Sequence, residues 1–210
     1  MGQPIDIAPL EPAMLDTAAH TLARAFVDDP MFEWVFPDAA TRTQKLVVLN
    51  RIPLEFGLRY GLMVTQCDRG RGVAIWLRPG QSLTPLGMAR SGMLTAPFRV
   101  GFASLGRFAR ANATMEPVHK TAMGGQPHWQ LLIVAVDPEL QGQGHGAALV
   151  RQGLDRADRD GLPCYLDTSK AANLPVYELL GFETVEQVPL GKGGPPGWGM
   201  RREPQPTRSD

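Results

Sequence analysis

The chain has 210 residues, and its 21 Lys and Arg residues balance its 21 Asp and Glu residues, so its formal net charge is zero. A chain of this length can bury a full hydrophobic core, and a single domain is the natural expectation. The balanced charge gives no basic surface field, which disfavours nucleic acid and anionic membranes as partners.

Targeting, membrane and metal signals are also weak. The start has neither a basic segment nor an apolar one, and no apolar run approaches the roughly 20 residues of a spanning helix. We therefore expect a cytoplasmic protein that does not act at a membrane. Cys67 and Cys164 lack the spacing of metal ligands, so we expect two buried, reduced thiols, no disulfide and no metal site.

The first third of the chain predicts a strand, two helices and a hairpin. Residues 3–9 alternate apolar and polar side chains as a strand does, and residues 14–26 have the apolar spacing of a helix, which Asp28-Asp29-Pro30 ends. A helix with a kink at Pro53 and two strands joined by a charged, glycine-rich turn follow at 43–60, 61–66 and 72–77.

An apolar, aromatic segment lies between the first two predicted helices. It reads Met-Phe-Glu-Trp-Val-Phe over residues 31–36. Such a run is usually part of the core, and this is the favoured interpretation. The alternative is a wall of a substrate pocket, formed by Phe32 and Trp34.

The remaining chain divides into a helical part and a mixed part. Residues 83–127 predict a helical insertion, because so long a connection between strands usually has its own helices. From His128 the pattern predicts the order strand, helix, strand, helix, strand, strand. We expect one domain over 1–202 and a polar, disordered tail over 203–210.

The residues from Leu131 to Leu149 carry the strongest functional signal. An apolar strand runs into a turn with Pro138, and three glycines at alternate positions then open a helix: Gly142, Gly144 and Gly146. Bare amides and the positive end of the helix dipole at such a terminus favour a phosphate or pyrophosphate.

Two common phosphate sites compete for this motif. A P-loop requires Lys and Ser or Thr after the last glycine, and Ala147 and Ala148 stand there instead. A dinucleotide site requires G-x-G-x-x-G and an acidic residue about twenty positions later, for which Asp167 is available. A nucleotide-dependent oxidoreductase therefore remains an alternative.

Two segments resemble the signatures of one superfamily. Residues 141–146, Gln-Gly-Gln-Gly-His-Gly, resemble the Arg/Gln-x-x-Gly-x-Gly/Ala signature of the GNAT superfamily of acyl-CoA-dependent N-acyltransferases. The segment from Asn173 through Tyr177 to Leu180-Gly181-Phe182 is similar to its second signature. Within the superfamily, four segments resemble the puromycin N-acetyltransferase group: residues 25–30, 74–76, 167–169 and 198–201.

This resemblance implies a fold and a cosubstrate. The expected fold is an α/β, mixed and mostly antiparallel seven-stranded sheet with a splayed central strand pair and helices on both faces. Acetyl-CoA would lie along this pair, with Asn173 near its pantetheine or adenosyl part. The pantetheine arm would contact the main chain of Val134, Ala135 and Val136. The pyrophosphate would contact the main chain of Gln141, Gly142, Gln143, Gly144, His145 and Gly146. An added Cβ at Gly144 or Gly146 should then disturb binding more than the truncation of a side chain outside the glycines.

The resemblance also implies an acetyl transfer to a primary amine by direct attack in a ternary complex. Tyr177 matches the residue that protonates the leaving thiolate, although it could instead only pack its helix on the sheet. Alternation places His128 and Gln130 on one face of their strand, where His128 acting through water is the candidate base.

Several interpretations stay open at this point. Glu33 and Glu116 are alternative bases, and His145 is expected to face solvent. The balanced charge favours a small, partly apolar amine near Phe32, Trp34 and Gln130. A non-catalytic acyl-CoA-binding protein is a further alternative, and the protein is expected to be a monomer or homodimer.

Overall fold

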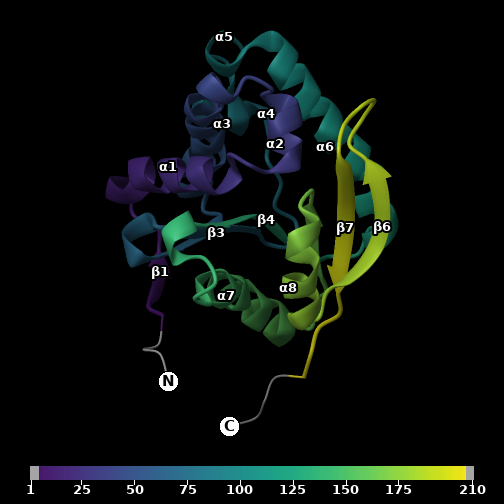
Figure 1. Cartoon of the computed structure of the whole chain (residues 1–210). Coiled ribbons are helices and arrows are strands. Elements are labelled where there is room, and N and C mark those ends of the chain that lie inside the picture. The colour runs from purple at the N-terminus through teal and green to yellow at the C-terminus, as the bar shows by residue number, and fades with distance from the viewer. Residues whose placement is uncertain (1–4, 207–210) are drawn as a thin grey trace.

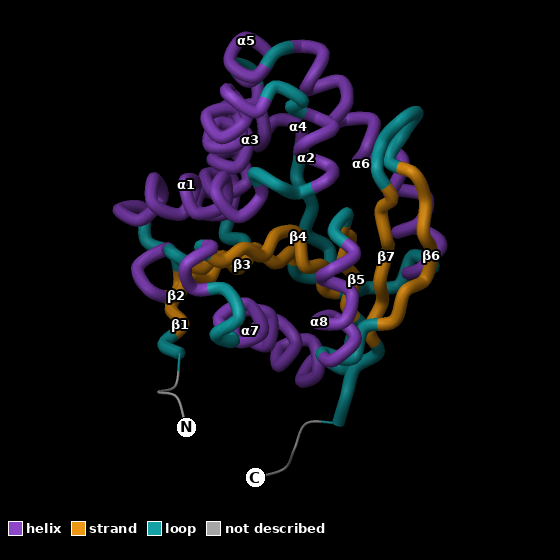
Figure 2. The backbone as a smooth tube through the Cα atoms, viewed as in Figure 1, coloured by secondary structure: helices purple, strands orange, loops and turns teal. Residues whose placement is uncertain are grey.

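The computed structural model describes residues 5–206, which fold around one seven-stranded sheet in the order β1-β2-β3-β4-β5-β7-β6 (Figures 1 and 2). Only β4 and β5 are parallel, and the other neighbouring strands are antiparallel. The strands are β1 (Ile7–Pro9), β2 (Met63–Cys67), β3 (Gly72–Leu77), β4 (Trp129–Val136), β5 (Cys164–Thr168), β6 (Glu183–Pro189) and β7 (Pro196–Arg202). The predicted mixed, mostly antiparallel sheet is confirmed.

Helices cover both faces of the sheet (Figure 1). Helices α7 and α8 pack on one face, whereas α1 and α3 pack on the other face of β2 and β3, and α6 covers β5 and β7 on that same side. The helices are α1 (Leu15–Phe26), α2 (Pro30–Val35), α3 (Ala39–Tyr60), α4 (Pro85–Met88), α5 (Ala96–Val100), α6 (Phe102–Met123), α7 (His145–Asp160) and α8 (Leu174–Leu179).

Local capping explains where the predicted and observed helices differ. The Asp29-Pro30 pair was expected only to end a helix, but it also begins α2, because Pro fits the first helical turn and the Asp29 side chain accepts from the Met31 amide at 2.9 Å. Asp38 caps α3 in the same way, so that helix starts at Ala39 and continues through Pro53. The predicted helix at 171–180 is a short 3₁₀ turn followed by α8.

The central strands β4 and β5 separate partway along their length. Their pairing covers only three positions and ends at Leu131 and Leu166, whereas β4 continues to Val136. On the other edge of β4 the register with β3 shifts, which leaves Leu132 without a partner residue. Such a bulge bends a strand. The two strands therefore form a fork that opens toward their carboxyl ends.

The two ends of the chain differ from expectation. The first strand covers only Ile7–Pro9, and residues 1–4 lie outside the described part. The tail was expected to be disordered from residue 203, but the Gln205 amide donates to Asp158 Oδ1 at 2.8 Å, which fixes this part against α7. Residues 207–210 of the predicted tail lie outside the described part. No helix within residues 5–206 combines the length and apolarity needed to cross a membrane.

Candidate active site

The glycine loop between β4 and α7 presents free amides at the open end of the fork. Gly142 and Gly144 have φ angles of +74° and +87°, which favour glycine. Across the part of the chain that the structure describes, no acceptor is found for the amides of residues 142–147, and the first helical bond is Ala148 to Gly144 at 3.0 Å. These donors and the dipole of the 16-residue α7 suit a phosphate group.

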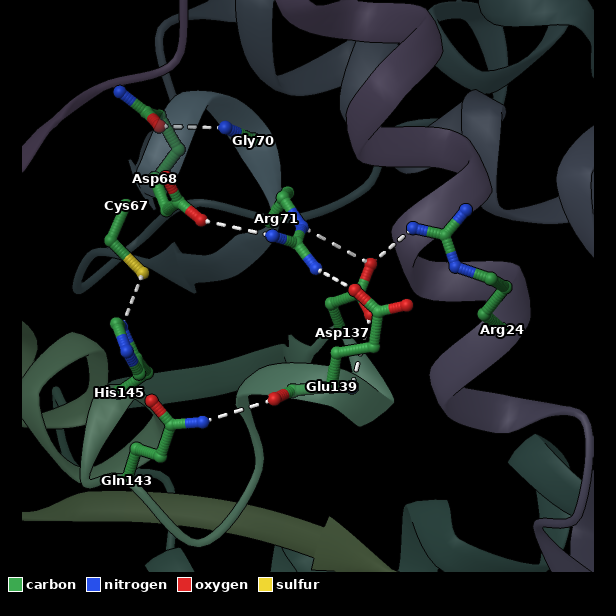
Figure 3. A network of polar contacts seen from close by, with 10 residues as sticks. Arg24, Cys67, Asp68, Gly70, Arg71, Asp137, Glu139, Gln143 and His145 are labelled. Atoms are coloured by element: carbon green, nitrogen blue, oxygen red, sulfur yellow. Dashed lines mark hydrogen bonds and ion pairs between the residues drawn. The ribbon is translucent and has the colours of Figure 1, made fainter.

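An ion-pair network supports this loop from the side of α1 and the β2–β3 turn (Figure 3). Arg24 and Arg71 both contact the Asp137 carboxylate, and Arg71 also pairs with Glu139. Burial opposes the ionisation of Asp137, but hydrogen bonds from Arg24 and from the Glu139 amide outweigh it, so the pKa of Asp137 is lowered. Gln143 Nε2 donates to the Glu139 carbonyl at 3.0 Å. The turn that leads into the loop is thus fixed before any ligand binds.

Two further side chains of the loop, besides Gln143, have protein partners. Gln141 Nε2 donates to the Val136 carbonyl at 3.0 Å, which ties the loop to the end of β4. His145 was expected to face solvent, but it is half-buried, and its Nδ1 lies 3.5 Å from Cys67 Sγ (Figure 3). The expectation was wrong because α7 packs on β2 and turns this first residue of the helix inward. Cys67 and Cys164 are buried free thiols, as expected.

The fork exposes the strand edge that was expected to contact pantetheine. Leu132, Ile133 and Val134 are half-buried, whereas Ala135 and Val136 beyond them are buried. One edge of this segment pairs with β3, and the other is not paired with β5. An extended ligand can add to such an edge through main-chain hydrogen bonds, as an added strand does.

Tyr177 lies beside the fork on α8. Its side chain is 8% exposed, and its hydroxyl forms no hydrogen bond with the residues that the structure describes. Burial, together with the nearby Asp29 carboxylate, raises the pKa of Tyr177 to about 12. The hydroxyl is therefore protonated at neutral pH and available as a proton donor. Asn173 precedes α8 and is half-buried, and its side chain does not cap the helix.

Sequence reasoning missed a buried contact next to Tyr177. Ser169, directly after β5, donates through Oγ to Asp29 Oδ1 at 2.7 Å, and both residues are 8% exposed. This bond ties the start of α2 to the end of β5. The segments containing the two residues resembled the puromycin group, but they lie 140 positions apart, and only tertiary structure brings them together.

The three residues expected to bind the acceptor lie in different places in the structure. Phe32 is 7% exposed and packs between Phe26 and Phe108, so it belongs to the helical core and is not accessible to a substrate. Trp34 is half-buried and packs toward α6 and the β6–β7 turn. Gln130 is half-buried opposite Tyr165, on the face of the sheet that α6 covers.

The candidate base His128 lies at the closed end of the fork. Its Nε2 is 2.7 Å from the Nε2 of His119, and its Nδ1 is 2.8 Å from the Gln126 carbonyl. At about 3.3 Å per residue, it lies roughly 13 Å along the strand from the point where the fork opens. This placement does not favour His128 as the base. The alternatives are also engaged, since Glu33 pairs with Arg42 and Glu116 with Lys120.

Asp167 does not lie where a dinucleotide site would need it. It occupies the face that α6 covers, and its Oδ1 accepts a hydrogen bond of 2.6 Å from the Tyr165 hydroxyl. Helix α7 lies on the opposite face. The sheet has one parallel pair, whereas a doubly wound fold requires a mostly parallel sheet. The oxidoreductase interpretation is therefore wrong.

Comparison with known proteins agrees with this geometry. The model of the acetyltransferase (GNAT) family matches residues 84–182. An uncharacterized N-acetyltransferase of Schizosaccharomyces pombe is 28% identical over 182 residues, covering 82% of this chain and 72% of that protein. A mycothiol acetyltransferase of Kocuria rhizophila is 28% identical over 209 residues, and the match covers 80% of this chain and 67% of that protein.

A solved structure shares the fold over nearly the whole chain. It is described as histone acetyltransferase HPA2 and related acetyltransferase from Corynebacterium glutamicum, with a TM-score of 0.65, 22% identity, and coverage of 98% of this chain and 99% of that one. The narrower resemblance to the puromycin group is not confirmed. Over residues 84–182 the chain is similar to the GNAT family of N-acetyltransferases, which use acetyl-CoA, and both the relatives and the shared fold agree with that similarity.

Proposed function

We propose that this protein transfers the acetyl group of acetyl-CoA to a primary amine of a small molecule, by direct attack within a ternary complex. One observation carries the proposal. Strands β4 and β5 separate beyond Leu131, the amides of the glycine loop lie at the open end of the fork, and Tyr177 lies beside it. Acyl transfer needs a held thioester, donors for the developing oxyanion and an acid for the thiolate.

Each of these needs has a group on this chain. The amides of residues 142–147 would hold the pyrophosphate, since they have free hydrogens and a helix dipole behind them. The main chain of Val134 to Val136 would bind the pantetheine arm, and one of its amides would polarise the thioester carbonyl. Tyr177 would protonate the leaving sulfur, and Asn173 would contact the pantetheine or adenosyl part.

The balanced charge of the chain supports a small acceptor. A histone tail or a nucleic-acid-bound substrate would call for a strong charge of one sign, and here the net charge is zero. One relative is named a mycothiol acetyltransferase, which also fits a small-molecule acceptor. Trp34 and Gln130 are the accessible candidates for contact with the acceptor on the α6 face.

Two measurements test the proposal. Acetyl-CoA should raise the melting temperature and NAD should not, because only a ligand that binds the native state stabilises it. Release of free CoA thiol should then depend on an amine, drawn from a panel containing an arylalkylamine, a polyamine and an aminonucleoside.

Tyr177→Phe should lower kcat about 100-fold or more, the usual contribution of a positioned acid. Tyr60→Phe, at an exposed position at the end of α3, is the matched control and should leave kcat unchanged. Binding of acetyl-CoA without thiol release for any amine would favour a non-catalytic acyl-CoA-binding protein. Full turnover by Tyr177→Phe would refute the role of Tyr177 as the acid and leave the proposed acetyl transfer standing.

A further inference from the structure

The proposed function leaves one chemical role without a residue, namely the group that receives the proton of the acceptor amine. His128 lies at the closed end of the fork, and Gln130 cannot take a proton. Two carboxylates lie near the fork, but Asp29 is buried and accepts hydrogen bonds from Ser169 and the Met31 amide, which leaves Asp167 as the accessible one. Asp167 follows Leu166, which is the last residue of β5 paired with β4, so it stands level with the first unpaired residue of β4.

Strand alternation places the Asp167 side chain on the face from which an acceptor would approach. Tyr165, two residues earlier, packs against α6 and stacks on His119 with ring centroids 4.1 Å apart. Asp167 therefore points to this same side. The glycine loop and α7 occupy the other face, so an acetyl group held in the fork would lie between the bound cosubstrate and Asp167.

The local structure is built to hold this carboxylate. Asp167 pairs across the sheet with Gly199 of β7, and a Cβ at Gly199 would lie only 2.6 Å from the Tyr165 hydroxyl. The missing side chain leaves the space through which Tyr165 reaches Asp167 Oδ1 at 2.6 Å. Tyr165 is fully buried, whereas Asp167 is exposed. One oxygen of an accessible carboxylate is thus fixed, and the other is available to a ligand.

The cation on the same face of the neighbouring strand is engaged elsewhere, because Arg201 pairs with Glu203 and donates to the Ala122 carbonyl. Asp167 forms no ion pair with the residues described in the structure. The negative charge of Glu186 of β6 helps to raise the pKa of Tyr165. Burial lowers the pKa of His119 of α6 to about 4, so its ring is neutral at pH 7. Gly199 of β7, which pairs with Asp167, has no side chain. Desolvation by the surrounding protein raises the pKa of Asp167 to about 6, although the hydrogen bond from Tyr165 partly offsets this rise.

We propose that Asp167 is a catalytic residue that binds the protonated acceptor amine and removes its first proton. This inference rests on the proposed function. Asp167 takes one proton from the ammonium group, and the nitrogen lone pair then attacks the acetyl carbon. The carbon–sulfur bond breaks, the sulfur takes the proton of Tyr177, and the second proton of the nitrogen returns to Tyr177. Asp167 then releases its proton to solvent, so each turnover yields one amide, one CoA thiol and one proton.

The test uses the whole 210-residue chain, acetyl-CoA and the best amine of the panel. Asp167→Asn keeps the size of the side chain and its acceptor oxygen, and Asp155→Asn on the exposed face of α7 is the matched control. We expect Asp167→Asn to lower kcat/KM for the amine at least 100-fold, with acetyl-CoA affinity unchanged by isothermal titration calorimetry. The acidic limb of the wild-type pH profile, near pH 6, should disappear.

Tyr165→Phe separates a catalytic role from a structural one. Loss of its hydrogen bond raises the pKa of Asp167 further, so the acidic limb should move to higher pH and persist. Normal turnover with an unchanged limb in Asp167→Asn would overturn this inference and leave the proposed function intact. A wild-type protein that binds acetyl-CoA and acetylates no amine would overturn both.

Discussion

Gly144 allows the phosphate-site hypothesis to be tested by a change of one carbon atom. Its φ is +87°, and no atom lies within 4 Å of an added Cβ, so Gly144→Ala meets no steric obstacle and costs only backbone strain. That strain is about 1–2 kcal/mol for an L-residue. In a chain of this size each kcal/mol lowers the melting temperature by about 2–4 °C, which predicts a fall of roughly 2–8 °C.

The same change should weaken the binding of CoA. If the loop relaxes to remove the strain, the amides around residue 144 no longer point together at one phosphate. The loss of one charge-assisted hydrogen bond costs about 1.5–3 kcal/mol, which corresponds to a roughly 10- to 100-fold higher Kd. Isothermal titration with CoA measures the affinity, and thermal denaturation measures the stability independently.

Gly146→Ala is the matched control in the same loop. The structure revises the expectation that a Cβ at Gly146 disturbs binding, because Gly146 lies inside α7 with an ordinary φ and an added Cβ would make a normal 3.7 Å contact with Val136. Ala is favoured over Gly in a helix by about 0.5–1 kcal/mol, so stability should rise slightly. The family signature also accepts Ala there, and CoA affinity should stay within about threefold of wild type. Wild-type affinity in Gly144→Ala, or an equal loss in both variants, would refute the phosphate site.

Three further predictions concern the rest of the molecule. Gly153→Ala would place a Cβ 2.2 Å from the Trp76 ring, and the resulting overpacking should outweigh the gain in helix propensity, with a net loss of about 1–3 kcal/mol in denaturant titrations. Arg202→Ala leaves Asp158 without its buried partner and should cost about 3–5 kcal/mol at pH 7. Burial opposes the ionisation of Asp158, but the hydrogen bond from Arg202 lowers its pKa on balance. The stabilisation is therefore present above the unfolded-state pKa near 4 and is lost as the pH falls through the folded-state pKa. The difference in the free energy of unfolding between wild type and variant should shrink in acid. Cys67 and Cys164, whose pKa values burial raises to about 11 and about 12, should resist a thiol reagent at pH 8 in the folded protein and react in guanidinium, and rapid labelling of the native state would contradict their burial.

Local signals along the sequence predicted most elements of the sheet and its helices. Alternating apolar residues, Asp and Pro at helix starts, and glycines at helix ends act within a few positions of one another, so they can be recognised without knowledge of the rest of the chain. The glycine loop belongs to this class, because consecutive residues supply both the turn and the free amides at the start of α7.

The structure corrected the predictions for side chains whose environment depends on distant segments. Phe32 lies in the core because Phe108 of α6 packs on it, and His145 faces inward toward Cys67 of β2. His128 lies at the closed end of the fork, where its Nε2 is 2.7 Å from the Nε2 of His119 of α6. None of these contacts leaves a signal near the residue that it affects.

The sequence by itself determined where the backbone presents free amides at the start of a helix, because amide direction follows from local φ and ψ angles. Only the tertiary structure decided which side chains meet at the fork. The contacts of Asp29 with Ser169 and the placement of Asp167 opposite the glycine loop follow from how strands and helices pack, and such packing is set by the whole chain together.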